Sequence, residues 1–133
     1  MDSFQVLGEV GSGTFGTVYQ ANVLHESMGR FRLLTQVALK KISLSCGRAI
    51  EKEMMVLHDV KGHANVIELL ACFIQRMKLR AYQASAYLGF PFFVNATPYK
   101  EYVGNITELE YTSYMHQLLL AVELIHWREI IHR

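Results

Sequence analysis

The sequence predicts an α+β fold in which an antiparallel sheet comes first and a long helix comes last. Segments rich in valine, phenylalanine, threonine and tyrosine, separated by glycines, occupy the start of the chain and are typical of strands. The spacing of apolar residues then changes to a helical period around residues 50–57, and a second helical stretch occupies residues 107–127.

The first strands are predicted at Phe4–Val10, Thr14–Val23 and Leu33–Ile42, with a loop around His25–Arg30. Their β-branched and aromatic side chains favour the pleated surface of a sheet. Glycines between the first two segments indicate a tight connection, as in a hairpin.

The next element is predicted to be a helix. Ile50, Met54 and Leu57 recur at positions i, i+4 and i+7, which places them on one face. The pair Lys61-Gly62 is expected to close this helix, because glycine is favoured just past a helix end.

Strand character returns at Val66–Ile74 and again at Phe90–Ala96. The stretch between them, residues 75–89, reads QRMKLRAYQASAYLG and has no clear apolar period. We interpret residues 75–89 as an insertion or a long loop.

The last helix is predicted to begin at a capping box. Thr107 is followed three residues later by Glu110, so each side chain can satisfy a backbone N–H of the other. Apolar residues then surround most of the helix circumference, which is typical of a helix enclosed within a larger fold.

The composition is apolar for a domain of this length. Of the 133 residues 51% are hydrophobic and the mean hydropathy is +0.15, so some apolar surface is expected to meet a partner outside the chain. A net charge of +1 gives no indication of binding to nucleic acid or to a membrane surface.

Targeting signals are not expected from the sequence. The N-terminal residues lack the basic region and apolar run of a signal peptide, and no run approaches the ~18 residues of a membrane span. Two cysteines make no disulfide framework, which favours a reducing intracellular compartment. Zinc is not expected either, because the set that Cys46, His58, His63 and Cys72 could form has an irregular spacing that matches no ligand arrangement.

A glycine-rich segment, GSGTFG at Gly11–Gly16, is the first candidate for chemistry. Glycines let the backbone approach phosphate oxygens without a side chain in the way. A dinucleotide-binding turn would lead directly into a helix, whereas a β-branched and aromatic segment follows here. The pattern therefore argues against a Rossmann-type oxidoreductase, and an ordinary hairpin turn remains an alternative.

The second candidate is Lys40, which ends the apolar run VALK. A lysine in that setting is costly unless its ammonium meets an anion. Glu53 borders the apolar stripe of the predicted helix and can supply that anion. The alternative, in which Lys40 ends an edge strand in water and Glu53 is solvated, remains open.

Taken in order, the glycine loop between strands, VALK and a helix with an inward glutamate resemble the small lobe of a eukaryotic protein kinase. His63–Val66 is similar to the turn that enters the fourth strand, Thr97–Lys100 to the hinge, and the final IIHR to the start of the catalytic loop. The resemblance implies a protein-kinase-like small lobe at residues 1–97, with an antiparallel sheet and the αC helix. Residues 98–133 would be the hinge and a long αE-like helix from an incomplete large lobe.

The resemblance also implies roles for individual residues. Lys40 would hold the α- and β-phosphates of ATP, steadied by Glu53, and these two are the candidate catalytic residues. Thr97 would be a small gatekeeper, while Pro98 would offer its carbonyl and Lys100 both backbone groups to adenine. The full set of implied nucleotide contacts is Val10, Gly11, Ser12, Gly13, Thr14, Phe15, Gly16, Thr17, Val18, Ala38, Lys40, Thr97, Pro98 and Lys100.

One further packing arrangement follows from the resemblance. Leu57 is expected to touch Leu69 on the fourth strand, with His132 beneath both.

Within the kinases, the hinge and the final helix are most similar to the cell division cycle seven-related group, which acts at replication origins. This resemblance implies a serine/threonine kinase that uses ATP and Mg²⁺, resides in the nucleus and has an activating regulatory subunit. In the family an aspartate follows IIHR, so neither that residue nor the magnesium ligands lie within this chain. The chain as written is therefore expected to be inactive alone, and a non-catalytic nucleotide-binding or scaffolding fragment is the alternative.

Overall fold

The computed structural model describes residues 3–14, 16–24, 35–43, 47–76, 84–97 and 99–131. The strands are β1 (Phe4–Gly13), β2 (Gly16–Val23), β3 (Gln36–Ser43), β4 (Ala71–Arg76) and β5 (Ala84–Pro91). The helices are α1 (Gly47–Asp59), α2 (Tyr99–Val103) and α3 (Glu108–Trp127). The predicted α+β class is confirmed.

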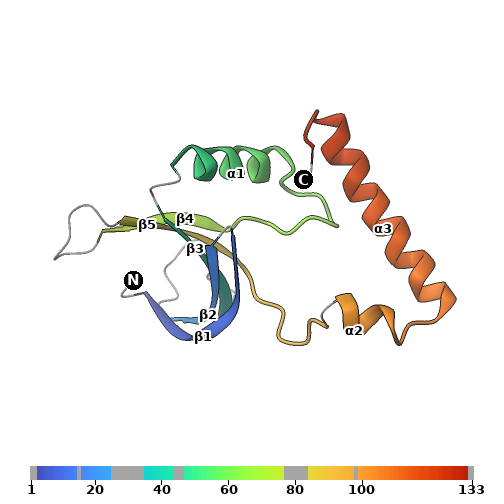
Figure 1. Cartoon of the computed structure of the whole chain (residues 1–133), viewed down its shortest axis with the longest axis horizontal. Helices are drawn as coiled ribbons and strands as arrows, with labels where there is room; N and C mark the ends of the chain where they lie inside the picture. Colours follow the sequence, from blue (N-terminus) through green and yellow to red (C-terminus); the bar gives the residue numbers. More distant parts are fainter. Residues whose placement is uncertain are drawn as a thin grey trace.

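All five strands form one antiparallel sheet in the order β1-β2-β3-β5-β4. Helix α1 lies along one face of this curved sheet, and α3 lies apart from the sheet beyond the extended connection that leaves β5 (Figure 1). The sheet is thus the framework on which the candidate site is built.

One core fills the face of the sheet away from α1. Its buried members are joined by Phe73, whose ring stacks between those of Phe4 and Tyr87 with centroid distances of 5.3 and 5.4 Å. The buried members of this cluster are Phe4, Ala21, Val37, Leu39 and Tyr87.

The second core lies between the sheet and α1. Ile50 of α1 is buried here, and Met54 and Leu57 pack against the same cluster, as their predicted helical face requires. The helix ends at Asp59, and Gly62 in the following turn has a φ of 86°, which favours glycine. The buried members of the cluster are Ile42, Ile50, Ala86, Leu88 and Phe90.

The interpretation of residues 75–89 as an insertion is wrong for the described part. Gln75 and Arg76 end β4, and Ala84–Gly89 belong to β5, which pairs with β3 on one side and β4 on the other. Residues 86–90 are all buried because one core covers each face of this central strand. A strand that is buried on both faces does not alternate between apolar and polar residues. Its sequence therefore lacks the two-residue period by which a half-buried strand is recognised.

Two predicted strands have different bounds in the structure. The fourth strand begins at Ala71 rather than Val66, although the Leu70 N–H already donates to the Gly89 carbonyl at 2.8 Å. Of the expected strand Phe90–Ala96, only Phe90 and Pro91 belong to β5. Proline has no N–H to continue a ladder, and the chain turns next, with the Ala96 N–H donating to the Phe93 carbonyl.

Helix α3 begins at the predicted capping box. Glu110 N–H donates to the Thr107 hydroxyl at 3.3 Å, and Thr107 N–H donates to the Glu110 carboxylate at 2.8 Å. The helix has no buried residue along its length, and several of its large apolar side chains, including Leu109 and Trp127, are exposed. The expectation that a larger fold covers this helix stays a prediction.

At its other end α3 stops in a Schellman arrangement. Ile130 N–H donates to the Ile125 carbonyl at 2.8 Å, and Glu129 N–H donates to the His126 carbonyl at 2.9 Å. Glu129 has a φ of 57°, the only positive value at a non-glycine residue in the described ranges. The chain direction at Ile130 is therefore set by a defined turn, at a cost in backbone strain.

Candidate functional site

An ion pair joins the sheet to α1 at the centre of the candidate site. Lys40 Nζ of β3 lies 2.5 Å from Glu53 Oε1 of α1, and the side chains retain 22% and 31% of their exposure. The prediction that these two groups approach each other is confirmed, and the alternative in which both are separately solvated is wrong. Partial exposure leaves the charged pair reachable from solvent.

The glycine segment forms the hairpin between β1 and β2. Gly13 pairs with Gly16, and an irregularity between Glu9 and Gly11 leaves Val10 without a partner in the ladder. Ser12 and Thr17 hydroxyls lie 3.5 Å apart across the hairpin. The glycines therefore sit between two strands, as predicted, rather than before a helix. Phe15 lies outside the described residues.

The glycines of this hairpin differ in what surrounds them. Gly16 has a φ of 126°, and a Cβ placed there would collide with the carbonyl oxygen of Lys41 on β3. A Cβ at Gly11 or Gly13 would meet no atom within 4 Å. Gly16 is thus required by the fold itself, whereas the other two leave open space beside the backbone.

Two further residues predicted to contact the nucleotide, Val18 and Ala38, lie on the same face of the sheet as Lys40. Val18 is paired with Lys40 across β2 and β3, so their side chains share a face, and Ala38 precedes Lys40 by two residues on that face. Ala38 packs against the cluster under α1. Val10 lies in the neighbouring strand β1 and is half exposed.

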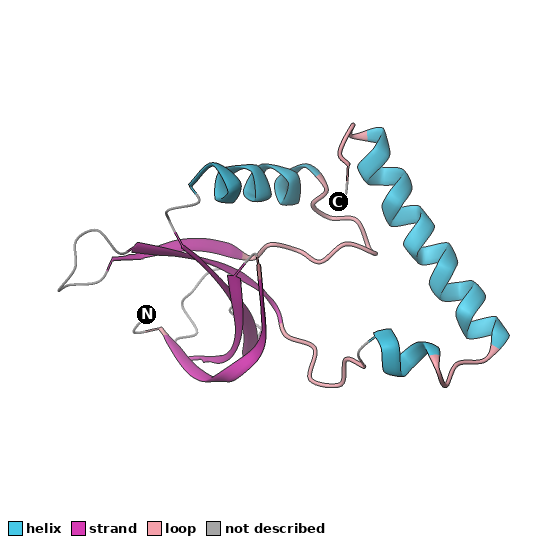
Figure 2. Ribbon diagram, viewed as in Figure 1, coloured by secondary structure: helices cyan, strands magenta, loops and turns pink. Residues whose placement is uncertain are grey.

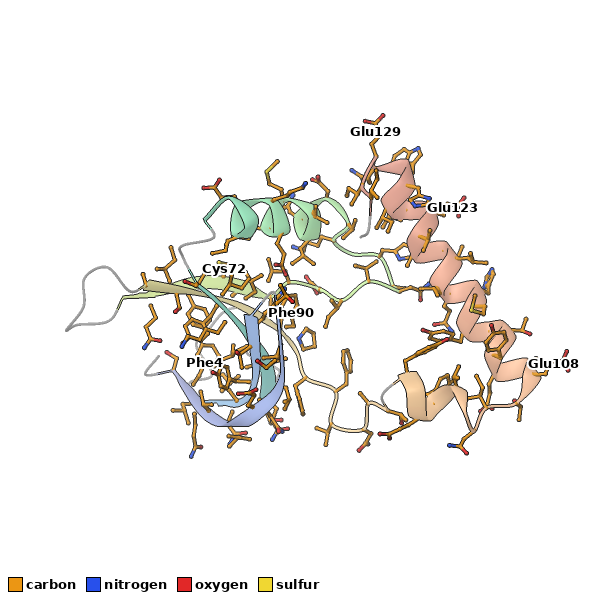
Figure 3. All side chains as sticks on the ribbon, viewed as in Figure 1. Phe4, Cys72, Phe90, Glu108, Glu123 and Glu129 are labelled. Carbon is orange, nitrogen blue, oxygen red and sulfur yellow. The ribbon has the colours of Figure 1, made fainter. Side chains whose placement is uncertain are left out.

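The same row of the sheet contains two residues that the sequence did not reveal. Phe90 pairs with Ala38 and Leu88 pairs with Lys40 on β5, and both side chains are buried. Leu88 was missed because residues 75–89 were interpreted as an insertion, and Phe90 was placed in a predicted strand without a partner. Figure 3 labels Phe90 at the sheet.

The predicted hinge residues lie after this strand. Thr97 is exposed in the loop that follows β5, and Pro98 lies outside the described residues. Lys100 belongs to α2, where only its backbone is described. Their contacts with a nucleotide stay predictions.

The predicted packing around Leu57 is described in part. Leu57 and Leu69 both pack against the cluster under α1, but Leu69 precedes β4 rather than lying on it. His132 lies outside the described residues. Cys72 packs in the same cluster, and burial raises the pKa of its thiol.

Metal ligands and membrane spans can be assessed only for the part of the chain that the structure describes. There, no three His, Cys, Asp or Glu side chains are placed to hold a metal ion. No helix in these same ranges combines the length and apolar character needed to cross a bilayer.

The arrangement can bind an anion by two different means. A lysine ammonium held by a carboxylate offers a fixed positive charge, and open space beside the backbone at Gly11 and Gly13 lets an anion approach the hairpin closely. Both features suit a polyphosphate. The arrangement therefore fits a polyphosphate chain, with the Lys40 ammonium held by the Glu53 carboxylate.

Comparison with known proteins agrees with this geometry. The sequence profile described as "Protein kinase domain" matches residues 4–133. The whole chain is 31% identical to "Probable cell division control protein 7 homolog 2" and to "homolog 1" of Encephalitozoon cuniculi, and it covers 34% of each. It is 26% identical over its whole length to "Cyclin-dependent kinase 20" of Pongo abelii and covers 36% of that protein. The chain thus spans about a third of the length of these relatives.

Proposed function

The chain belongs to the protein kinase domain family, as its resemblance predicted, and on this premise we propose that it is the ATP-binding portion of a protein kinase. The whole protein would transfer the γ-phosphate of ATP to serine and threonine hydroxyls. Residues 1–97 would form the small lobe, and residues 98–133 the hinge and the start of the large lobe.

The observation that supports this proposal is the 2.5 Å contact between Lys40 Nζ and Glu53 Oε1. Glu53 holds the ammonium at a fixed position on the face of the sheet that also carries Val18 and Ala38. Because its side chain is already held in one orientation, Lys40 can bind the α- and β-phosphates without first having to change rotamer. ATP, when bound with Mg²⁺, supplies the phosphoryl group and the charge neutralisation for transfer.

The remaining contacts surround this pair. Backbone N–H groups of the hairpin residues 12–16 would cover the phosphates, and Val10, Val18 and Ala38 would lie over the adenine ring. Backbone groups at Thr97, Pro98 and Lys100 would pair with the edge of the base. Thr97 is the proposed gatekeeper. It lies in the loop after β5, whereas Phe90 of β5 is the residue that pairs with Ala38 in the sheet.

The relatives add a biological setting to the proposal. Two of them are named as cell division control proteins and the third as a cyclin-dependent kinase. We propose that this chain serves a kinase of cell-division control, acting in the nucleus on protein substrates at the stage of DNA replication. An activating regulatory subunit is part of this proposal.

The test compares two adjacent lysines of β3 in the full-length protein. Lys40→Met is expected to lower phosphotransfer to a protein substrate by a hundredfold or more, about the loss seen when one preorganised electrostatic donor is removed. Lys41→Met is the matched control, because Lys41 follows Lys40 on the strand and points to the opposite face. Its activity should stay close to that of the wild type.

Three results would contradict the proposal or redirect it. Equal loss in both variants would show that the strand, rather than the Lys40 ammonium, is responsible. Transfer that survives Lys40→Met would remove the proposed role of this residue. Tight ATP binding without any transfer by the wild type would favour the non-catalytic alternative.

A further inference from the structure

Three tyrosines join α2 to α3. The ring of Tyr114 on α3 lies 5.7 Å from that of Tyr99 and 5.9 Å from that of Tyr102, measured between centroids. The interplanar angles are 29° and 57°, within the offset and tilted geometries that aromatic pairs prefer. Tyr99 and Tyr102 are three residues apart on one face of α2, so both can meet the same ring. We call Tyr99, Tyr102 and Tyr114 the tyrosine clamp.

The connection between the two helices is short and hydrogen-bonded at both ends. Asn105 closes α2, donating from its side chain to the Glu101 carbonyl and from its backbone to the Tyr102 carbonyl, both at 3.1 Å. Two residues later Thr107 begins the capping box of α3. The two helices therefore meet in a defined corner, which Figure 2 shows at the lower end of α3.

This corner fixes the far end of the segment that leaves the sheet. The near end is fixed at Pro91, which pairs with Val37 in the sheet. The far end is Tyr99, the first residue of α2 and a member of the clamp. Residues 92–98 run between these two anchors, and Lys100, a proposed adenine contact, directly follows Tyr99.

We propose that Tyr114 is a positioning residue for the nucleotide, acting through Tyr99 and Tyr102 to hold the hinge backbone where it meets adenine. The inference rests on the proposed function. A hinge that is ordered before binding loses less conformational freedom when ATP arrives, so the clamp lowers the Kd for ATP. The phosphates are held elsewhere, at Lys40, so the rate of transfer from bound ATP should not depend on the clamp.

The experiment measures the Kd for ATP and kcat in the full-length protein, with amide hydrogen exchange over residues 99–103. Tyr114→Ala should raise the Kd about tenfold, a factor that corresponds to about 1.4 kcal/mol, with kcat little changed. It should also speed exchange in α2. Tyr114→Phe keeps the ring and should restore both values. Tyr111→Ala is the matched control on the same helix, because Tyr111 is 45% exposed and outside the clamp.

Each outcome decides one point. If Tyr114→Ala speeds exchange but leaves the Kd for ATP unchanged, the clamp joins the helices without positioning the nucleotide, and the proposal is overturned. If Tyr114→Ala lowers kcat by as large a factor as it raises the Kd for ATP, or if Tyr114→Phe does not restore the wild-type Kd, the proposal that the stacked rings position the nucleotide is overturned. A wild-type protein that does not bind ATP would overturn the proposed function and this inference together. Normal binding by wild type and Tyr114→Ala alike would overturn only the inference.

Discussion

The sheet and helix α3 have similar hydrophobic content but opposite surroundings. Leu39, Leu88 and Val37 of the sheet are fully buried, whereas α3 has no buried residue and exposes Leu109 to 80% and Trp127 to 75%. Side chains of neighbouring strands bury one another, and α1 packs on one face of the sheet. The extensive contacts between described elements are all between neighbouring strands, so α3 receives no comparable cover.

This difference shows where each region obtains its stability. Apolar burial supports β3 and β5 from both sides, and it places Lys40 within reach of Glu53 as a consequence. Helix α3 depends instead on its own termini: the capping box at Thr107 and the turn at Glu129. Figure 3 labels Phe4, Cys72 and Phe90 at the sheet, and Glu108 at one end of α3. Exposed apolar patches of this kind are common at surfaces that contact another protein or domain.

The same substitution in the two regions gives the largest expected difference. Leu88→Ala removes a fully buried side chain from the central strand and should lower the free energy of unfolding by about 2–5 kcal/mol. Leu109→Ala on α3 should change it by less than about 0.5 kcal/mol, because little burial is lost. Chemical denaturation of the two variants beside the wild type measures both. Comparable losses would mean that α3 is covered in the protein and that the contrast is wrong.

A second comparison lies within the glycine hairpin. Gly16→Ala forces a side chain into a φ of 126° and against the Lys41 carbonyl, so it should destabilise the fold by about 2 kcal/mol or more. Gly13→Ala meets open space, and its effect on stability should be small. Under the proposed function, Gly13→Ala should instead weaken ATP binding, because the added methyl occupies space beside the phosphates. Thermal unfolding and ATP affinity, measured on both variants, separate the two roles. Equal melting temperatures would contradict the structural role of Gly16.

What the sequence could predict follows from how local the signals are. The capping box depends on only two residues three positions apart, so it could be predicted from the sequence, and Thr107 and Glu110 form it in the structure. The Lys40–Glu53 pair combines a strand pattern with a helix pattern, and each was readable alone. Residues 84–89 of β5 were missed because both faces of this strand are buried by residues distant in the chain, so its sequence does not alternate between apolar and polar residues. The pairing of this strand with Lys40 and Ala38 was missed as well, since register between distant strands is set by packing.

The smallest expected effect is a pH dependence confined to the start of α3. Backbone and side-chain hydrogen bonds from Thr107 lower the pKa of the exposed Glu110 carboxyl. A carboxyl whose pKa is lower in the folded state stabilises that state above its unfolded pKa of about 4.3, and this contribution is lost as the pH falls through the folded pKa. Protonation weakens the carboxyl as an acceptor for the Thr107 N–H and hydroxyl, and it should therefore fray the first turn of α3 while leaving the sheet intact. Hydrogen exchange at residues 108–111, corrected for the intrinsic exchange rates, should show protection that falls as the pH is lowered. Glu110→Gln is expected to remove that pH dependence, and Glu108→Gln, which leaves the capping box intact, is the matched control. A pH response that survives Glu110→Gln, or that appears equally in the sheet, would show that the capping box does not set the stability of this end of the helix.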